Sequence, residues 1–213
     1  GLLIDLRSLN HTGSGDFADD LFKFRTMTEV EKTTFVFSGV TYLNDSKTSL
    51  KADLDMDMKA MKFAFLDNEL KVNNLILGMK GFVAMPGDPI DMDLKFDVRE
   101  NSFGNFMSII PGAYKKDFDK AKSSGSLALN GFLKGTYSQN SMPGFGLTVK
   151  INDGSFSYPE LPVALSKVSA DLNINNPDGV PDHTLINLQK FHMEIGKDAF
   201  DAHLLIKTPV TDP

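Results

Sequence analysis

The sequence predicts a mainly β protein, with antiparallel strands in a curved sheet that is groove-like or partly closed. Two observations lead to this prediction. Apolar and polar residues alternate with a period of two over much of the chain, as they do in strands with one buried face. Short clusters of Gly, Pro, Asn and Asp separate these stretches, which favours hairpin connections between neighbouring strands.

Three stretches show the clearest alternation. From Leu50 to Ala60 every even position is apolar, and Lys or Asp occupies every odd position, so we expect one face in water. At Met61 the alternation changes phase, which predicts a bulge or a bend. The same period two predicts strands at Ile90–Val98 and Phe200–Ile206.

Weaker alternation predicts the remaining strands. They are Thr33–Tyr42, Val72–Met85, Gly125–Tyr137, Phe145–Ile151, Ser155–Tyr158, Val168–Asn175 and Leu185–Ile195. Turns are expected at Pro86–Pro89, Asn152–Gly154, Asn176–Gly179 and Gly196–Asp198, because these clusters hold the residues that turns favour.

The stretch between residues 102 and 121 departs from the strand pattern. Apolar residues at 103, 106, 107 and 110 have helical spacing, with Ser102 as the N-cap and Pro111-Gly112 as the end. Tyr114–Ala121 is expected to form a second short helix, and Pro162–Lys167 a short helical turn.

Four short sequence blocks recur in the same order at offsets of about 110 to 118 residues, such as KADLDM at 51–56 and SADLNI at 169–174. We therefore expect a first β repeat unit over residues 1–100, a short helical insertion over 101–122 and a second β repeat unit over 123–213. The units are expected to form one continuous structural domain, and each would continue the sheet of its neighbour.

Composition excludes several classes of function. The chain has 213 residues, no Cys and a net charge of −6, so thiolate chemistry and binding to the phosphate backbone of nucleic acids are not expected. It contains no apolar run of the length of a membrane span and no serine nucleophile elbow. We expect a non-enzymatic protein without cofactor, cut from a longer chain that carries any anchor.

Two metal-site hypotheses are weak. Asp53, Asp55 and Asp57 resemble the start of a calcium loop, but the Gly and Glu that such a loop needs further on are missing, so these carboxylates are expected on the solvent face of a strand. His192 and His203 would lie on neighbouring strands, yet the repeat provides no matching pair, and structural or surface roles are expected for both.

The apolar faces of the predicted strands are the remaining candidate site. They are rich in Met and Phe, including Phe65 and Phe82, and Met adapts to irregular apolar partners. The alternatives are an ordinary core and a groove for lipid acyl chains. The candidate groove residues are Leu54, Met56, Met58, Phe63, Leu77, Met92, Leu94 and Phe96.

Five segments of the chain carry a resemblance to a known family. They are GFVAMPGDPIDMDLKF (81–96), SIIPGAYKKDF (108–118), SGSLALNGFLKGTY (124–137), MPGFGLTVKINDGSFSYPELP (142–162) and INLQKFHMEIGKDAFDAHLLIKTPVTDP (186–213). They resemble the AsmA family of Gram-negative envelope proteins, which is related to TamB. The resemblance covers most of the chain and is most specific from residue 74 onwards.

This resemblance implies a periplasmic segment of a protein that is held in the inner membrane by an N-terminal anchor outside this chain. It implies a role in outer-membrane biogenesis through binding or transfer of phospholipid along an apolar β groove, with flanking repeat units of the same chain as neighbours. The alternative is a structural or chaperone-like module with a closed core, on which Phe106 and Ile110 pack. Such a module would act on other envelope proteins through its sheet edges.

Overall fold

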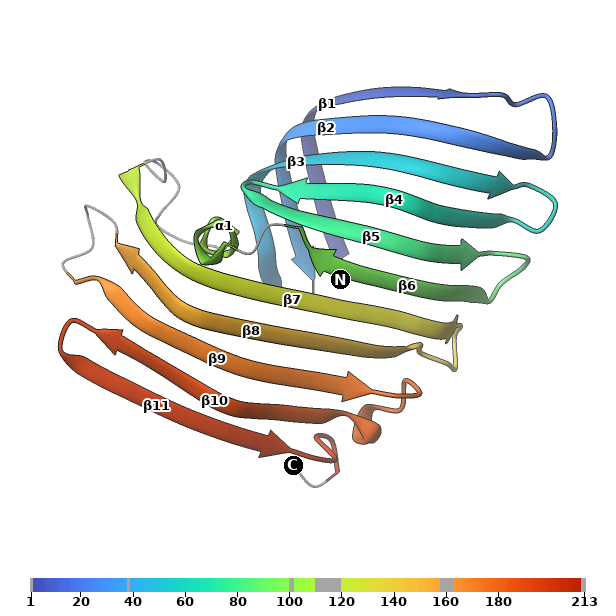
Figure 1. Cartoon of the computed structure of the whole chain (residues 1–213). Helices are drawn as coiled ribbons and strands as arrows, with labels where there is room; N and C mark the ends of the chain where they lie inside the picture. The colour runs from blue at the N-terminus through green and yellow to red at the C-terminus, as the bar shows by residue number, and fades with distance from the viewer. Residues whose placement is uncertain (1, 38, 100–101, 110–119, 158–162, 212–213) are drawn as a thin grey trace.

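A computed structural model describes residues 2–37, 39–99, 102–109, 120–157 and 163–211. Their strands form one antiparallel sheet of eleven strands in which every strand pairs with the next along the chain (Figure 1). The strands are β1 Leu2–Gly15, β2 Leu21–Phe37, β3 Val40–Asp57, β4 Lys62–Val72, β5 Leu75–Ala84, β6 Ile90–Val98, β7 Lys122–Tyr137, β8 Gly144–Ser157, β9 Leu165–Asn176, β10 Leu185–Ile195 and β11 Asp198–Ile206.

Two short helical elements accompany the sheet. The helix α1, Phe103–Met107, lies between β6 and β7, and a 3₁₀ turn, Pro181–His183, lies between β9 and β10. The predicted cap is confirmed, because Ser102 Oγ accepts a hydrogen bond of 3.3 Å from the backbone N–H of Asn105. No helix in the described part of the chain combines the length and apolar character that a membrane crossing requires.

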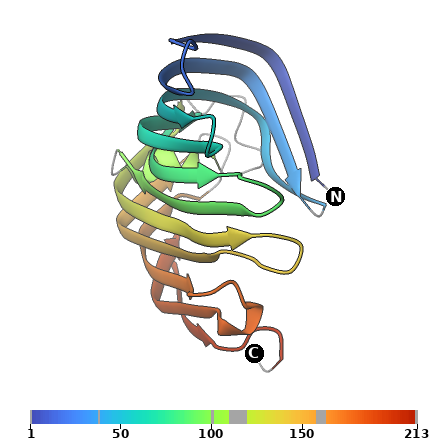
Figure 2. The same ribbon diagram turned by 90° about the vertical axis from the view of Figure 1, so that its right-hand side faces the viewer.

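The sheet is a single curved layer, with β1 and β11 as its edges (Figures 1 and 2). Its accessible surface is 13163 Å². A compact monomer of 23.4 kDa would expose only about 9,700 Å², so roughly a third more surface is in water than a two-layer domain would leave. The prediction of a mainly β, antiparallel and curved sheet is confirmed.

The strands bend where their pairing is irregular. The register shifts between β7 and β8 at Gly125 and between β8 and β9 near Asp153, and both residues have positive φ, +94° and +48°. Bulges of this kind bend a strand and increase its twist. The long strands therefore curve around α1, which lies inside the bend (Figure 1).

The core lies between α1 and the sheet. Phe103 is 2% exposed and packs with buried side chains of β5 to β9, among them Leu75, Val98, Leu127, Ile151, Phe156 and Val168. The C-terminal end of α1 is fixed by Asn73, whose Nδ2 donates to the Ser108 carbonyl at 2.7 Å. The helix thus covers part of the central strands, β5 to β9.

The predicted strands agree with the structure in most places. The predicted bounds of Ile90–Val98 and Leu185–Ile195 are confirmed, and Phe200–Ile206 lies within β11. Val168–Asn175 and Gly125–Tyr137 are strands as predicted, each slightly longer in the structure.

Five predictions about turns and strand ends are wrong. The alternating stretch from Leu50 to Ala60 belongs in part to β3, which begins at Val40 and ends at Asp57. The change of phase at Met61 marks the turn to β4 rather than a bulge or a bend within one strand. Thr33–Tyr42 and Val72–Met85 each contain a turn between two strands. Asn152–Gly154 is a bulge within the single strand β8, so Phe145–Ile151 and the described part of Ser155–Tyr158 belong to one element.

The helix predictions had a mixed outcome. α1 is confirmed, although Ile110 lies outside the described residues, as does most of Tyr114–Ala121. The helical turn predicted for Pro162–Lys167 is wrong for Leu165–Lys167, which already belong to β9. The sheet continues across the boundaries proposed at residues 100 and 123, because β6 pairs directly with β7.

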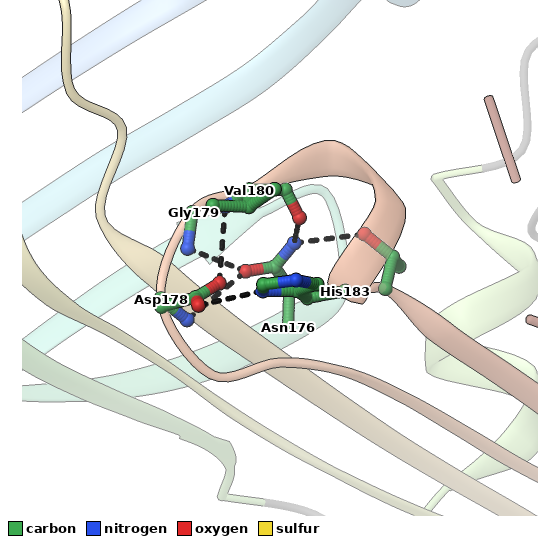
Figure 3. Close-up of polar contacts among 6 residues, drawn as sticks. Asn176, Asp178, Gly179, Val180 and His183 are labelled. Carbon is green, nitrogen blue, oxygen red and sulfur yellow. Dashed lines mark hydrogen bonds and ion pairs between the residues drawn. The ribbon is translucent and has the colours of Figure 1, made fainter. Parts of the chain in front are cut away.

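A network of hydrogen bonds around Asn176, which we call the polar clasp, orders the connection between β9 and β10 near the C-terminal edge of the sheet (Figure 3). Asn176, at the end of β9, is fully buried, and its Oδ1 accepts hydrogen bonds from the N–H groups of Asp178 and Gly179. Its Nδ2 donates to the Val180 carbonyl at 2.7 Å and to Thr184 Oγ1 at 2.8 Å. All four hydrogen-bonding positions of the buried amide are therefore used.

Two carboxylates extend this clasp. The pKa of Asp178 is lowered, first by its hydrogen bond with His183 Nδ1 at 2.7 Å and then by the Val180 N–H. Burial tends to raise the pKa of Asp182, but the N–H groups of Thr211 and Val210 donate to it, and its pKa is lowered on balance. Asp182 thus ties the segment after β11 to the β9–β10 connection.

Acidification is expected to open this clasp. A carboxyl group whose pKa is lower in the folded state stabilises that state above its unfolded pKa, about 3.9, and this contribution is lost as the pH falls through the lower folded value. Below about pH 4, the protection factors of the Val210 and Thr211 amides, which correct the exchange rate for its intrinsic pH dependence, should therefore fall. Asp182→Asn should lower these protection factors already at pH 7, whereas Asp88→Asn in the β5–β6 turn should not. Equal protection factors at pH 3 and pH 7 in the unsubstituted chain would contradict this assignment.

Candidate functional site

Residues that lie directly opposite each other on neighbouring strands point to the same face of the sheet. The register therefore groups their side chains into rows that cross the strands. Met56 of β3 lies opposite Phe22 and Phe63, and the row continues through Val83 to Met92 of β6. A second row runs from Phe24 through Leu54, Phe65, Gly81, Leu94 and Leu133 to Phe145. Side chains from β2 to β8 therefore share one apolar face.

The same face continues to the C-terminal edge. Leu147 lies opposite Ile174, which lies opposite Ile186, and Ile186 lies opposite Ile206. Two residues further along each strand, a second row is formed by Val149, Leu172, Leu188 and Leu204. We call this surface the apolar face; its rows run from Phe22 and Phe24 to Ile206 and Leu204.

Most side chains of the apolar face are only partly buried. Leu54, Phe63, Met92 and Phe96 all have intermediate exposure, although none is at a sheet edge. Among the described elements, only α1 packs on this face, where it contacts β5, β7 and β8. Toward β11 the side chains become exposed, to 52% at Phe200 and 47% at Leu204.

The opposite face is polar and carries ion pairs between neighbouring strands. Arg25 Nε lies 3.1 Å from Asp53 Oδ1, and Lys150 Nζ lies 3.0 Å from Asp171 Oδ2. Lys23 approaches Asp55 in the same way, so the prediction that these Asp residues lie on the solvent face of a strand is confirmed for Asp53 and Asp55. The two faces of the sheet thus differ in polarity along most strands, as alternation with a period of two predicts.

Seven of the eight candidate residues lie on the apolar face. They are Leu54, Met56, Phe63, Leu77, Met92, Leu94 and Phe96. Met58 does not belong to a strand, because it lies in the turn after β3, where it is 41% exposed. Phe82 was expected among the apolar side chains, but it lies opposite Asp93 on the polar face, under the ammonium group of Lys62 at 4.3 Å.

Sequence reasoning missed the C-terminal half of the apolar face. Leu172, Ile174, Ile186 and Leu188 are half-buried there. The signal was present, because period two is visible in both predicted strands that contain them. It also missed Asn68, which is fully buried on this face and whose Oδ1 accepts a hydrogen bond of 2.7 Å from the Asp53 N–H. Asn68 thereby holds an irregular stretch of the β3–β4 pairing in place.

The histidines occupy polar positions. His192 Nδ1 lies 2.7 Å from Asp201 Oδ1, and His183 belongs to the clasp described above. Within the described ranges, no three His, Asp or Glu side chains are grouped so that they would hold a metal ion. The apolar face can bind a ligand by removing apolar surface of that ligand from water.

Comparisons of the chain with protein-family models, with curated proteins and with solved structures find no match. The geometry of the sheet and the difference between its two faces are the structural observations that bear on function.

Proposed function

We propose that this chain is a non-enzymatic, periplasmic lipid-binding segment that holds phospholipid acyl chains on the apolar face. The observation that carries the proposal is a continuous apolar face, from β2 to β11, on a sheet that the described residues cover only at α1. The sequence resemblance to the AsmA family supports the same function and a role in outer-membrane biogenesis.

The driving force is removal of apolar surface from water on both partners. Each methylene group of an acyl chain that leaves water contributes about 0.8 kcal/mol. The ten strands from β2 to β11, spaced about 4.8 Å apart, make a face roughly 43 Å wide along the sheet, so several chains fit side by side or in series. No headgroup pocket is needed, because polar headgroups remain in water at the open side of the face.

Charge on the apolar face should prevent this binding. Leu54→Asp and Met92→Asp each place a carboxylate where acyl chains would lie, and uptake of a fluorescent fatty acid should fall by about tenfold or more. The matched control is Asp55→Asn on the polar face of the same strand, which should bind as the unsubstituted chain does. Folded Asp variants that still take up the probe would show that this face is not the binding site.

A milder substitution covers the case in which the Asp variants do not fold. The chain contains no Cys, so a single Met92→Cys variant can be labelled without background. Excess fatty acid should slow its reaction with a maleimide, whereas Asp97→Cys on the polar face should react at the same rate with or without fatty acid. Equal protection at both positions would contradict the proposal.

The second candidate function is pairing with other envelope proteins through the sheet edges. A module with a closed core, as this alternative was first stated, does not fit a single open sheet. Phe106 does pack on the core as expected. The observation that favours edge pairing is the exposure of apolar side chains on β1, 56% at Ile4 and 53% at Leu9. A Leu9→Pro variant would block edge pairing while leaving acyl uptake unchanged, which separates the two functions.

A further inference from the structure

The polar face has a region in which two basic side chains face each other. At several other paired positions on this face a basic side chain lies directly opposite a carboxylate, as Lys23 does with Asp55, Arg25 with Asp53, Lys51 with Glu69, Lys134 with Asp93 and Lys150 with Asp171. Lys80 of β5, by contrast, lies directly opposite Lys95 of β6. Like charges at paired positions destabilise a sheet, so this pair calls for a physical reason.

Three ammonium groups gather here, and none of them forms an ion pair within 4 Å among the described residues, although Lys62 lies opposite Asp57 in the register. Lys62, Lys80 and Lys95 line a depression of ≈470 Å³ between β4, β5 and β6. Of the described carboxylates, only Asp93 lines the same depression, and it is paired with Lys134 at 3.1 Å. The depression therefore carries an excess of positive charge in a chain whose net charge is −6.

Part of the wall of the depression is apolar. Phe82 holds the Lys62 ammonium 4.3 Å from its ring centre, and Ala64 and Leu66 also line this part. The depression is open to solvent, and an anion in it would interact with several ammonium groups at once.

We propose that Lys62, Lys80 and Lys95 form an anion site for a phosphate group, on the face of the sheet opposite the apolar face. An anion between Lys80 and Lys95 would remove their repulsion and supply the negative charge that their neighbours on this face obtain from carboxylates. The phosphate group belongs either to a lipid headgroup or to a small soluble phosphate. Both sources present the same chemistry to the lysines.

The test compares two double variants with the same change of net charge. Lys80→Gln/Lys95→Gln removes the unpaired ammonium groups, and Lys23→Gln/Lys150→Gln removes two that already have carboxylate partners. Binding of the full chain to phosphatidylglycerol vesicles should weaken by about tenfold or more in the first variant and much less in the second. Lys80→Arg/Lys95→Arg should restore it. Phosphatidylcholine vesicles set the background.

A second arm distinguishes the source of the phosphate. Inorganic phosphate, added while the side-chain NMR signals of the chain are followed, should shift the signals of Lys80 and Lys95 if the ligand is a small soluble anion. Vesicle binding without such shifts assigns the site to a lipid headgroup. If neither probe binds, or if both double variants weaken binding equally, the proposal is overturned.

This site is independent of the proposed acyl binding. Fatty-acid uptake on the apolar face should be unchanged in Lys80→Gln/Lys95→Gln, because the substituted side chains lie on the other face. Failure of one assay thus leaves the result of the other assay intact.

Discussion

Phe103→Ala is expected to lower the free energy of unfolding by about 3–5 kcal/mol, as truncation of a buried Phe usually does. Phe103 is 2% exposed and is the main contact of α1 with the sheet, where Leu127 and Phe156 are almost fully buried. A single-layer sheet has few such contacts, and those around α1 form its described core. Urea unfolding followed by circular dichroism would measure the loss.

Phe17→Ala is the matched control for this substitution. Phe17 is 65% exposed in the β1–β2 connection, although it contacts the rings of Phe22 and Phe24. Its loss should cost about 1 kcal/mol at most. If Phe103→Ala proved as mild as Phe17→Ala, the stability of the sheet would not depend on α1.

Gly81→Ala is the second substitution with a large expected effect, about 4 kcal/mol. Gly81 has a φ of +128°, which costs a residue with a side chain about 1–3 kcal/mol. In addition, a Cβ at this position would collide with the carbonyl oxygen of Asp93 on β6, and overpacking of this kind costs about 1–3 kcal/mol. The backbone clash can be relieved only by separating β5 from β6.

Gly135→Ala separates these two contributions. Gly135 has the same φ of +128°, but its nearest neighbour would be Pro143 Cα at 3.4 Å, an ordinary contact. It should therefore show the conformational strain without the collision. Gly87→Ala in the β5–β6 turn, where the nearest atom would be 3.9 Å away, should be close to neutral. Equal losses for Gly81→Ala and Gly135→Ala would show that the approach of β6 to Gly81 is not limiting.

The strands that could be predicted from sequence share two properties. Ile90–Val98 alternates strictly, and Leu185–Ile195 alternates in two segments on either side of residues 189–190. Both have a turn signal at or near both ends, and their bounds were predicted correctly. β1 was missed because Ser8, with a φ of +56°, interrupts its alternation. Most of β2 was missed because Thr26 and Thr28 occupy positions on the apolar face where alternation would place apolar residues.

Two errors arose because the same residue types occur in different kinds of local structure. Asn152-Asp153-Gly154 has turn composition, but Asp153 with φ of +48° serves as a bulge, which bends β8 without ending it. Phe82 was assigned to the wrong face because β5 is apolar on both sides, with Ile76 and Phe82 on one and Leu77 and Val83 on the other. In such a strand, alternation with a period of two does not show which side chains point to which face.

The candidate site was predictable only in part. Strict alternation in β3 and β6 was enough to group Leu54, Met56 and Met92 on one face. The pairing of Lys80 with Lys95 depends on the register between β5 and β6, which no local pattern encodes. The contrast between paired and unpaired lysines therefore becomes visible only in the folded sheet.

Native mass spectrometry of the purified 213-residue chain, followed by solvent extraction and lipid analysis, tests the central claim most directly. Phospholipid is expected to co-purify at a defined stoichiometry and to be lost in a folded Met56→Asp variant, while Asp55→Asn retains it. A mass without bound lipid, together with no uptake of a fluorescent acyl probe, would contradict the claim that the apolar face binds acyl chains.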